Sequence, residues 1–389
     1  MMIKRGKRTN SEKLESLKNF EKHDALLVSL SAVFLGLLAG LILMLLIGQN
    51  GFLGYSYLIK GAMMNLRRVG DTLATSTVLV FAGLAIGFAY KVGLFNIGVS
   101  GQMLAGGFAA SVFANYTTMP RGPALICLFL IALLAGGIWG FIPGILKAKF
   151  NVNEVVATIM MNWIAYWSVY SLVPVWIKNP NQETESIAIA AKYTFRADWI
   201  SNIFGGSNQV NTTLVIAIVT VIILKFILNK TTLGFELKSV GFNKYCSEYA
   251  GIKVNRDIAL TMMISGAVAG LAGLSYYLGY SDRIQIGIMP SMGFDGIAVA
   301  LLGNLNPIAI FFSGAFFGIL QSGKGFMNAN MLIPPQIGDT IIAIIIYFIA
   351  TSILIKNFYG KIIRKRIEKI ENIIDEPTEP KQVPVKEVE

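Results

Sequence analysis

Long apolar runs, separated by charged or turn-rich breaks, dominate the chain. About 20 apolar residues in a helix cross a hydrocarbon core of about 30 Å, and such runs recur throughout. We read ten approximate spans, at Ala25–Ile47, Thr72–Tyr90, Leu94–Ala114, Pro123–Leu146, Val155–Ile177, Thr212–Leu228, Ile258–Gly279, Met289–Leu302, Pro307–Gln321 and Ile337–Ile355. The pattern predicts an all-α polytopic membrane protein with about ten transmembrane helices, of which Met289–Leu302 is short and broken.

Composition agrees with this interpretation. Hydrophobic residues make up 54% of the 389 residues and charged residues only 14%, whereas ordinary soluble domains carry roughly 25% charged residues. The first run follows a basic tail and could be a secretory signal. It is about twice as long as a signal core and lacks a convincing small-x-small cleavage site, so we expect a retained first span.

The Lys and Arg residues predict the orientation, because cytoplasmic segments carry an excess of them. They gather in three alternate segments, namely the tail before the first span, residues 230–257 and the tail after the last span. The opposite loops Asn115–Gly122 and Ser322–Gln336 hold only Arg121 and Lys324. We therefore expect a cell-membrane protein with a basic cytoplasmic N-terminal tail (1–24), a membrane domain (25–355) and a cytoplasmic, largely disordered C-terminal tail (356–389).

The net charge of +11 lies in the tails and loops, so anionic membrane lipid, and not nucleic acid, is the expected partner. The chain has no phosphate-binding Gly-x-x-x-x-Gly-Lys-[Ser/Thr] loop. His23 is its single histidine, which argues against a His-based metal site and against a Ser/His catalytic set. We therefore expect no enzyme activity, no catalytic residue, no metal and no cofactor in this chain.

Two glycine-punctuated segments are candidates for a solute path. Gly93 to Gln102 joins two apolar runs without any charge, and broken helix at membrane depth is tolerated only where protein buries it or water lines it. A polar interfacial turn is the alternative, and Asn96 and Gln102 are the residues to test. Gly293 to Pro307 occupies a comparable place in the second half, which suggests pseudo-repeated halves.

Two further polar residues belong with these segments. Asp295 is an acid within a membrane run, where it normally faces the bundle interior or water, although it could instead cap a short helix. Asn162 lies two helical turns after Glu154, close to the same face. Glu154 is best explained as a charge at a helix start, while Asn162 is a candidate pathway residue. Glycines inside other spans, as at Gly136 and Gly266, indicate close helix packing.

The loop Thr231–Ile252 is the longest predicted cytoplasmic connection, and it mixes apolar residues with charges. Leu237, Val240, Tyr245 and Tyr249 can form one face. A short amphipathic helix pair here could lie on the membrane surface or dock on a partner protein.

Four motifs together resemble the nucleoside-type permeases of ABC importers, which belong to the superfamily of the ribose and branched-chain amino acid permeases. They are Phe-Asn-Ile-Gly-x-x-Gly-Gln (95–102), Asn-Glu-Val-Val-Ala-Thr-Ile-Met-Met-Asn (153–162), Tyr-Ala-Gly-Ile (249–252) with Ser-Gly-Ala-x-Ala-Gly-Leu-Ala-Gly (265–273), and Gly-Phe-Asp-Gly-Ile-Ala-Val-Ala-Leu-Leu-Gly (293–303). The chain departs from the family at Val99-Ser100, where Ala-Glu is common, at Asn304, where Arg is frequent, and at Lys244, where Pro is frequent.

The resemblance implies a type II-like importer permease that pairs with a second, similar permease, docks on a cytoplasmic ABC ATPase and receives nucleosides from an extracellular lipid-anchored binding protein. The implied pathway residues are Phe95, Asn96, Gln102, Asn162, Phe294 and Asp295, with Phe95 or Phe294 available to stack on a base. The implied ATPase-coupling residues are Leu237, Gly241, Tyr245, Glu248, Tyr249 and Gly251. A permease for a simple sugar such as ribose, an ion-coupled secondary transporter and a non-transporting membrane scaffold stay open as alternatives.

Overall fold

The structure is a computed structural model that describes residues 24–331 and 335–351. Most of the expected N-terminal tail, the whole expected C-terminal tail and the last four residues of the expected tenth span lie outside the described residues. The elements are α2 (Asp24–Leu46), α3 (Gly51–Met63), α4 (Leu66–Tyr90), α5 (Val99–Tyr116), α6 (Arg121–Phe150), α7 (Glu154–Trp176), η1 (Ala191–Tyr193), α8 (Asp198–Ile203), α9 (Thr213–Lys230), α10 (Thr232–Phe242), α11 (Lys244–Tyr249), α12 (Val254–Ser275), η2 (Tyr276–Tyr280), α13 (Met292–Leu302), α14 (Pro307–Met331) and α15 (Pro335–Ala350).

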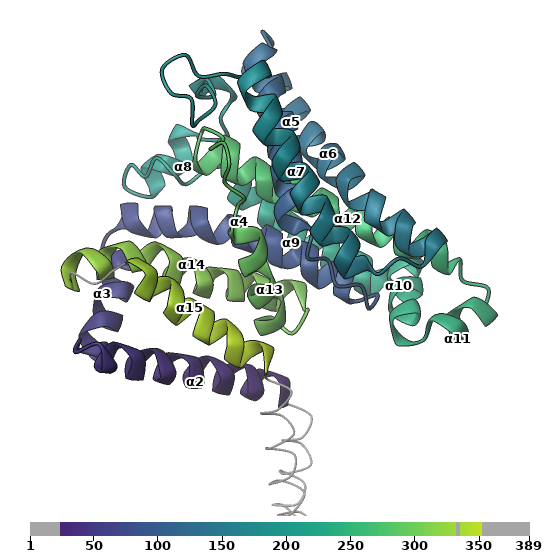
Figure 1. The fold of residues 1–389 in the computed structure, drawn as a ribbon, viewed down its shortest axis with the longest axis horizontal. Coiled ribbons are helices and arrows are strands. Elements are labelled where there is room, and N and C mark those ends of the chain that lie inside the picture. Colours follow the sequence, from purple (N-terminus) through teal and green to yellow (C-terminus); the bar gives the residue numbers. More distant parts are fainter. Residues whose placement is uncertain (1–23, 332–334, 352–389) are drawn as a thin grey trace, which may run out of the picture.

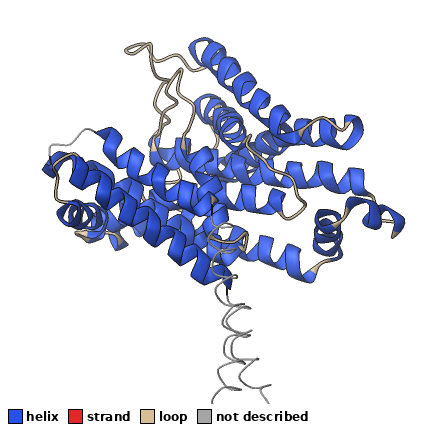
Figure 2. Ribbon diagram, turned by 60° about the horizontal axis from the view of Figure 1, so that its bottom comes forward, coloured by secondary structure: helices blue, strands red, loops and turns tan. Residues whose placement is uncertain are grey.

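The predicted all-α class is confirmed for the described residues, which form helices joined by loops and two isolated β-bridges (Figure 2). Each expected span overlaps one of these helices. By length and apolar composition, α4, α6, α7, α9 and the continuous helix α12–η2 could each cross a membrane, and the bent pair of α2 and α3 raises that number to six. The ten crossings inferred from the sequence stay a prediction.

Helix α3 was not expected from the sequence. The side-chain oxygen of Asn50 accepts hydrogen bonds from the backbone N–H groups of Phe52 (3.1 Å) and Leu53 (3.2 Å), which is a helix N-cap. The chain bends by 118° between α2 and α3, so that α3 lies across the ends of α2 and α14 (Figure 1). Its 13 residues are too few for a span. Its glycines and Lys60 are typical of a loop, so the sequence pattern did not indicate a helix.

Three expected boundaries were wrong by five residues or more, and one of them is the start of α4, which is Leu66 and not Thr72. Helix α5 begins at Val99 and not at Leu94, because Gly93 has a positive φ of 77° and residues 94–97 have no regular structure. Helix α14 continues to Met331, beyond Gln321, because its last part packs against α3, with Gly323 against the backbone of Leu58. A long-range contact therefore extends a helix across the polar residues at which the sequence suggested an end.

Helix α12 lies at the centre and packs against α4, α5 and α6. Gly136 and Gly140 of α6 face Gly266 and Gly270 of α12 so closely that an added Cβ would overlap the backbone of the opposite helix. The predicted close packing at glycines is confirmed here, as small residues let membrane helices approach. Helices α13 and α14 pack on α4, and α15 pairs with α2 (Figure 1).

Candidate translocation pathway and coupling segment

The segment after α4 is non-helical and buried inside the bundle. Leu94 is 4% exposed and Asn96 is fully buried. The Nδ2 of Asn96 donates to Oε1 of Gln102 (2.9 Å) and to Oγ of Ser265 on α12 (2.8 Å), while its Oδ1 accepts from the N–H of Gly98 (3.0 Å) and from Nε2 of Gln102 (3.2 Å). The predicted break in the helix at Gly93 to Gly98 is confirmed, and protein buries it.

Asn162 of α7 holds the same segment from the other side. Its Oδ1 accepts from the N–H of Gly101 (2.8 Å) and its Nδ2 donates to the carbonyl of Ile97 (3.0 Å). Buried backbone groups that lack helical partners are costly unless another group satisfies them. The amides of Asn96 and Asn162 supply those partners, so the interrupted backbone is stable at this depth.

Three of the predicted pathway residues, Asn96, Gln102 and Asn162, thus come together in one network. Phe95 lies beside them, half-buried, with its ring packed edge-on against Tyr90 at 5.8 Å. The hydrogen bonds of the three amides go to protein groups in this conformation. Their contact with a solute stays a prediction.

The second glycine-punctuated segment meets the first. Ser100 at the start of α5 donates from Oγ to the carbonyl of Pro290 (3.0 Å), and an added Cβ at Gly293 would overlap the backbone of Ser100. The start of α13 therefore lies directly against the start of α5. The two segments that the sequence singled out, almost 200 residues apart, form one contact.

Phe294 and Asp295 project from this part of α13. The Phe294 side chain is 40% exposed. Asp295 is partly buried and accepts a hydrogen bond from Nε2 of Gln321 on α14 (2.9 Å). The N-cap position of α13 belongs to Ser291, and no side chain caps the helix, so the Asp295 carboxylate bonds a neighbouring helix and does not act as a cap.

Glu154 behaves as a charge at a helix start. It forms an ion pair with Lys147 of α6 (2.9 Å), and the N-cap of α7 is Asn153, whose Oδ1 accepts from the N–H groups of Val155 and Val156. This agrees with the interpretation of Glu154 as a charge at a helix start. Asn162, two helical turns later, is the residue that contacts the broken segment.

The coupling segment, residues 231–252, folds into the predicted pair of short helices, α10 and α11. The four residues expected on one face do not share one: Leu237 and Val240 of α10 are buried, whereas Tyr245 and Tyr249 of α11 are 73% and 96% exposed. Phe242, at the end of α10, is 92% exposed. Glu248 is exposed too, and Gly251 has a positive φ of 83° that ends the pair. Helices α10 and α11 lie beyond the end of the bundle (Figure 1), and their exposed rings form an aromatic surface.

The coupling segment is attached to the bundle at two points. Gly241 lies so close to the turn after α4 that an added Cβ would overlap the carbonyl oxygen of Lys91. Burial, and secondarily the nearby charge of Lys238, lower the pKa of Lys91. Arg256 at the start of α12 forms ion pairs with Glu236 of α10 and with the buried Asp257. Helices α4, α10 and α12 are therefore joined at this end.

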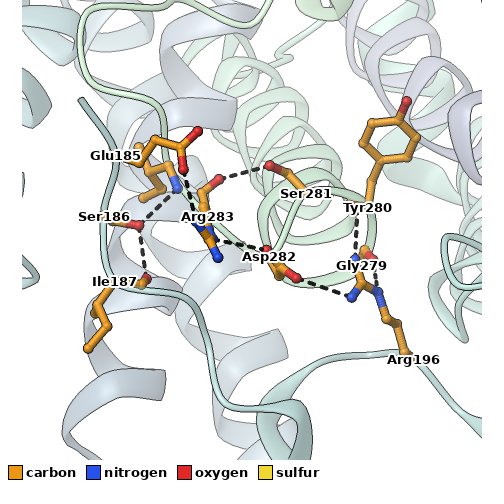
Figure 3. Close-up of polar contacts among 10 residues, drawn as sticks. Glu185, Ser186, Ile187, Arg196, Gly279, Tyr280, Ser281, Asp282 and Arg283 are labelled. Carbon is orange, nitrogen blue, oxygen red and sulfur yellow. Dashed lines mark hydrogen bonds and ion pairs between the residues drawn. The ribbon is translucent and has the colours of Figure 1, made fainter. Parts of the chain in front are cut away.

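At the opposite end of α12, a polar network joins its last turn to the segment 178–211 (Figure 3). Arg196 donates to the carbonyls of Gly279 and Tyr280 (both 2.9 Å) and pairs with Asp282 (3.2 Å). Arg283 pairs with Glu185 (3.1 Å). Sequence analysis missed these charges, because their partners lie almost 100 residues apart.

Two cavities open beside this network. One of about 450 Å³ is lined by Asn179, Gln182, Ile187 and Arg283 among others. A second, of about 300 Å³, lies between Tyr170 and Pro174 of α7 and the polar residues Asn179, Gln182 and Glu185. The Glu185–Arg283 ion pair joins the walls of the two cavities.

A third feature missed from the sequence is a row of aromatic side chains on α7, which we call the aromatic ladder: Trp163, Tyr166, Trp167 and Tyr170. Their spacing of three and four residues places them on one helix face. That spacing was the available signal, but it looks like ordinary apolar bulk within a membrane run.

Comparison with known proteins gives consistent results. The family model described as "Branched-chain amino acid transport system / permease component" matches residues 68–350. The chain is 41% identical to the guanosine ABC transporter permease protein NupP of Bacillus subtilis, over 87% of this chain and 97% of the relative. It is 40% identical to the nucleoside ABC transporter permease protein NupB of Lactococcus lactis, over 85% and 92%.

A more distant relative from the same Bacillus, the guanosine ABC transporter permease protein NupQ, is 27% identical over 69% of this chain and 88% of its own length. No solved structure matches the chain. The matched model covers most of the chain, including the broken segment, the coupling segment and α13, and the relatives match nearly end to end. The chain therefore belongs to the family of branched-chain amino acid transport system permease components, and it is an ABC transporter permease.

Proposed function

We propose that this chain is the membrane-spanning permease subunit of an ATP-driven importer that carries nucleosides into the cell. The observation that carries the proposal is the similarity, at 40–41% identity over almost the whole chain, to two permeases whose names specify guanosine and nucleosides. The buried break between α4 and α5 supports it, because interrupted helices mark solute paths in transport proteins.

The proposed path runs along the contact between the starts of α5 and α13. Phe294 and Asp295 face it with an exposed ring and a partly buried carboxylate, and Phe95 offers a second ring for stacking on a base. Asn96, Gln102 and Asn162 shape the path by holding its backbone, and we propose that they contact the solute when the bundle rearranges.

We propose ten crossings in pseudo-repeated halves, with α13 as a half-span, and with both termini in the cytoplasm of a cell-membrane protein. The described chain starts in α2 and ends in α15, and these two ends lie close together (Figure 1). Their proximity supports an even number of crossings, and the basic loop 230–257 supports a cytoplasmic location for α10 and α11. The domain limits 25–355 and the two tails are proposed with it.

The proposed partners follow from the same assignment. A separate cytoplasmic ATPase hydrolyses ATP and docks on the aromatic surface of the coupling segment, where Tyr245, Glu248 and Tyr249 are exposed. A second, different permease completes the path, which the match of two permeases of one Bacillus to this chain supports. A lipid-anchored binding protein delivers the nucleoside from outside.

The test is uptake of radiolabelled guanosine, adenosine, uridine and ribose by cells with and without this gene, repeated with the cognate ATPase disabled. We expect loss of nucleoside uptake in both mutants and unchanged ribose uptake. Loss of ribose uptake alone would identify a sugar permease. Nucleoside uptake that survives without the ATPase and collapses with an uncoupler would identify an ion-coupled transporter and overturn the proposal.

A further inference from the structure

The aromatic ladder is continuous. The ring centroids of Trp163 and Tyr166 lie 5.6 Å apart, those of Tyr166 and Trp167 5.1 Å, and those of Trp167 and Tyr170 5.5 Å. The rings of Tyr166 and Tyr170 are stacked at 6.5 Å with an interplanar angle of 22°. Successive rings along one face are therefore in mutual contact, as in aromatic clusters that favour stacked and edge-to-face pairs.

The rest of the described chain leaves the ladder uncovered, because Trp163, Trp167 and Tyr170 are 51%, 56% and 47% exposed. Aromatic residues that serve only as membrane anchors lie at the two interfaces, as do Tyr116 and Trp176 at the ends of α5 and α7. Trp163, in contrast, lies about 14 Å along α7, near the middle of its length. An interfacial belt does not account for an aromatic row at that depth.

The loop of residues 284–290 runs beside the ladder. The Tyr166 hydroxyl donates to the carbonyl of Gly287 (3.2 Å), in the loop that leads from the Arg283 ion pair to Pro290 and the start of α13. The ladder therefore lies beside the connection between the outer network of Figure 3 and the proposed path at Phe294.

The cavity of about 300 Å³ lies at the outer end of the ladder and contains both kinds of group that a nucleoside requires. Tyr170 and Ile286 give it an apolar side, and Asn179, Gln182, Glu183 and Glu185 give it hydrogen-bonding groups. Its volume is at the lower end of the range of about 300–1,000 Å³ for small-molecule sites. An aromatic wall opposite polar groups is suited to a flat base joined to a hydroxylated sugar.

We propose that this cavity and the aromatic ladder form an outer subsite, in which the base of an arriving nucleoside stacks on Tyr170 while its sugar bonds to the polar groups around Gln182 and Glu185. The inference rests on the proposed function. It adds a binding site that the nucleoside occupies before it reaches the path at α13. Trp167, Tyr166 and Trp163 then offer successive ring surfaces toward that path.

Protection of an introduced cysteine tests the subsite directly. Tyr170→Cys is placed in the full transporter, with its ATPase and second permease, in lipid nanodiscs, and a hydrophilic methanethiosulfonate reagent is added with and without guanosine. Peptide mass spectrometry measures modification at position 170. We expect guanosine to slow the reaction severalfold. Trp199→Cys, at an exposed aromatic position of α8 outside the spans and the cavities, is the matched control, and its reaction should not respond to guanosine.

Uptake by ring-retaining and ring-removing variants gives the second readout. Tyr170→Phe should keep guanosine uptake near the wild-type level, whereas Tyr170→Leu should raise the guanosine concentration for half-maximal uptake by about fivefold or more, as expected for loss of one stacked base. An unreactive cysteine at position 170, a reaction rate that ignores guanosine, or equal uptake by the two variants would overturn the subsite. Absence of nucleoside uptake by the wild type would instead overturn the proposed function.

Discussion

At the scale of single residues, buried amides replace the hydrogen bonds of a missing helical turn. Asn96 and Asn162 each bind backbone groups of the segment between α4 and α5. The sequence indicated Asn96 and Gln102, because polar amides among glycines inside an apolar run are unusual. It did not indicate Ser265 as a partner, since a serine in a helix usually bonds its own preceding turn.

The variant Asn96→Leu tests this network. It removes the acceptor of the Gly98 N–H and the donor to Gln102 and Ser265, and an unsatisfied buried polar group costs about 1–3 kcal/mol. We expect a clearly lowered unfolding temperature for the purified protein in detergent. Asn202→Leu, at an exposed position of α8, is the control, and an equal effect of both variants would contradict the role of the network.

The exposed aromatic residues of the coupling segment lead to a second prediction. Aromatic anchors contribute most of the binding free energy at protein interfaces, at about 2 kcal/mol or more for each. Tyr245→Ala and Tyr249→Ala should therefore each weaken association with the ATPase by roughly tenfold or more, measured by co-purification at graded concentrations. Trp199→Ala, at an exposed aromatic position on α8, should leave association unchanged, and wild-type association of both tyrosine variants would refute the docking surface.

At the scale of elements, the apolar pattern located the helices well and their connections poorly. Each expected span overlaps a helix, because burial of its apolar side chains in lipid or protein stabilises the helix. Helix α3 was missed, since it is short, interrupted by glycine and capped by a single Asn50 side chain. The start of α5 was misplaced, because the left-handed conformation of Gly93 and the hydrogen bonds of distant amides decide it.

Close packing of α10 on the turn after α4 makes Gly241 an informative position. In Gly241→Ala, the new methyl group would overlap the carbonyl oxygen of Lys91, so α10 must move, at a cost of about 1–3 kcal/mol for overpacking. We expect nucleoside uptake to fall severalfold while the amount of protein in the membrane is unchanged. Gly122→Ala, where an added Cβ meets nothing within 4 Å, should transport normally, and normal transport by both variants would exclude this packing role.

At the scale of the whole molecule, pairings between distant helices decide the architecture. Helices α6 and α12 meet at glycines about 130 residues apart in sequence, and the pairs of Arg196 with Asp282 and of Arg283 with Glu185 join residues 86 and 98 apart. A single sequence shows that such glycines and charges exist but not which ones meet. The sequence therefore did not predict the two cavities beside these ion pairs or the neighbours of the aromatic ladder, although it contains the residues that form them.

The native Cys246 provides a test of the orientation. It is exposed on α11, whereas Cys127 lies within the span α6. If the coupling segment is cytoplasmic, a membrane-impermeant maleimide added to intact protoplasts should leave Cys246 unlabelled and should label it after permeabilisation. Gly122→Cys lies in the first turn of α6, on the side expected to face outward. It should react in intact protoplasts. Labelling of Cys246 from outside would reverse the topology.

Helix α12 and its π-helical end η2 form one continuous helix from Val254 to Tyr280. Ion pairs through Arg256 join its first turn to α10, and Arg196 donates to the carbonyls of its last turn. Just beyond that turn, Arg283 pairs with Glu185 at the wall of the two cavities. The helix is thus held by polar contacts at both of its ends. In the proposed orientation α10 and the cavity rim lie at opposite faces of the membrane, and this one helix connects them, so a displacement of α10 would reach the cavity rim without any further element between them.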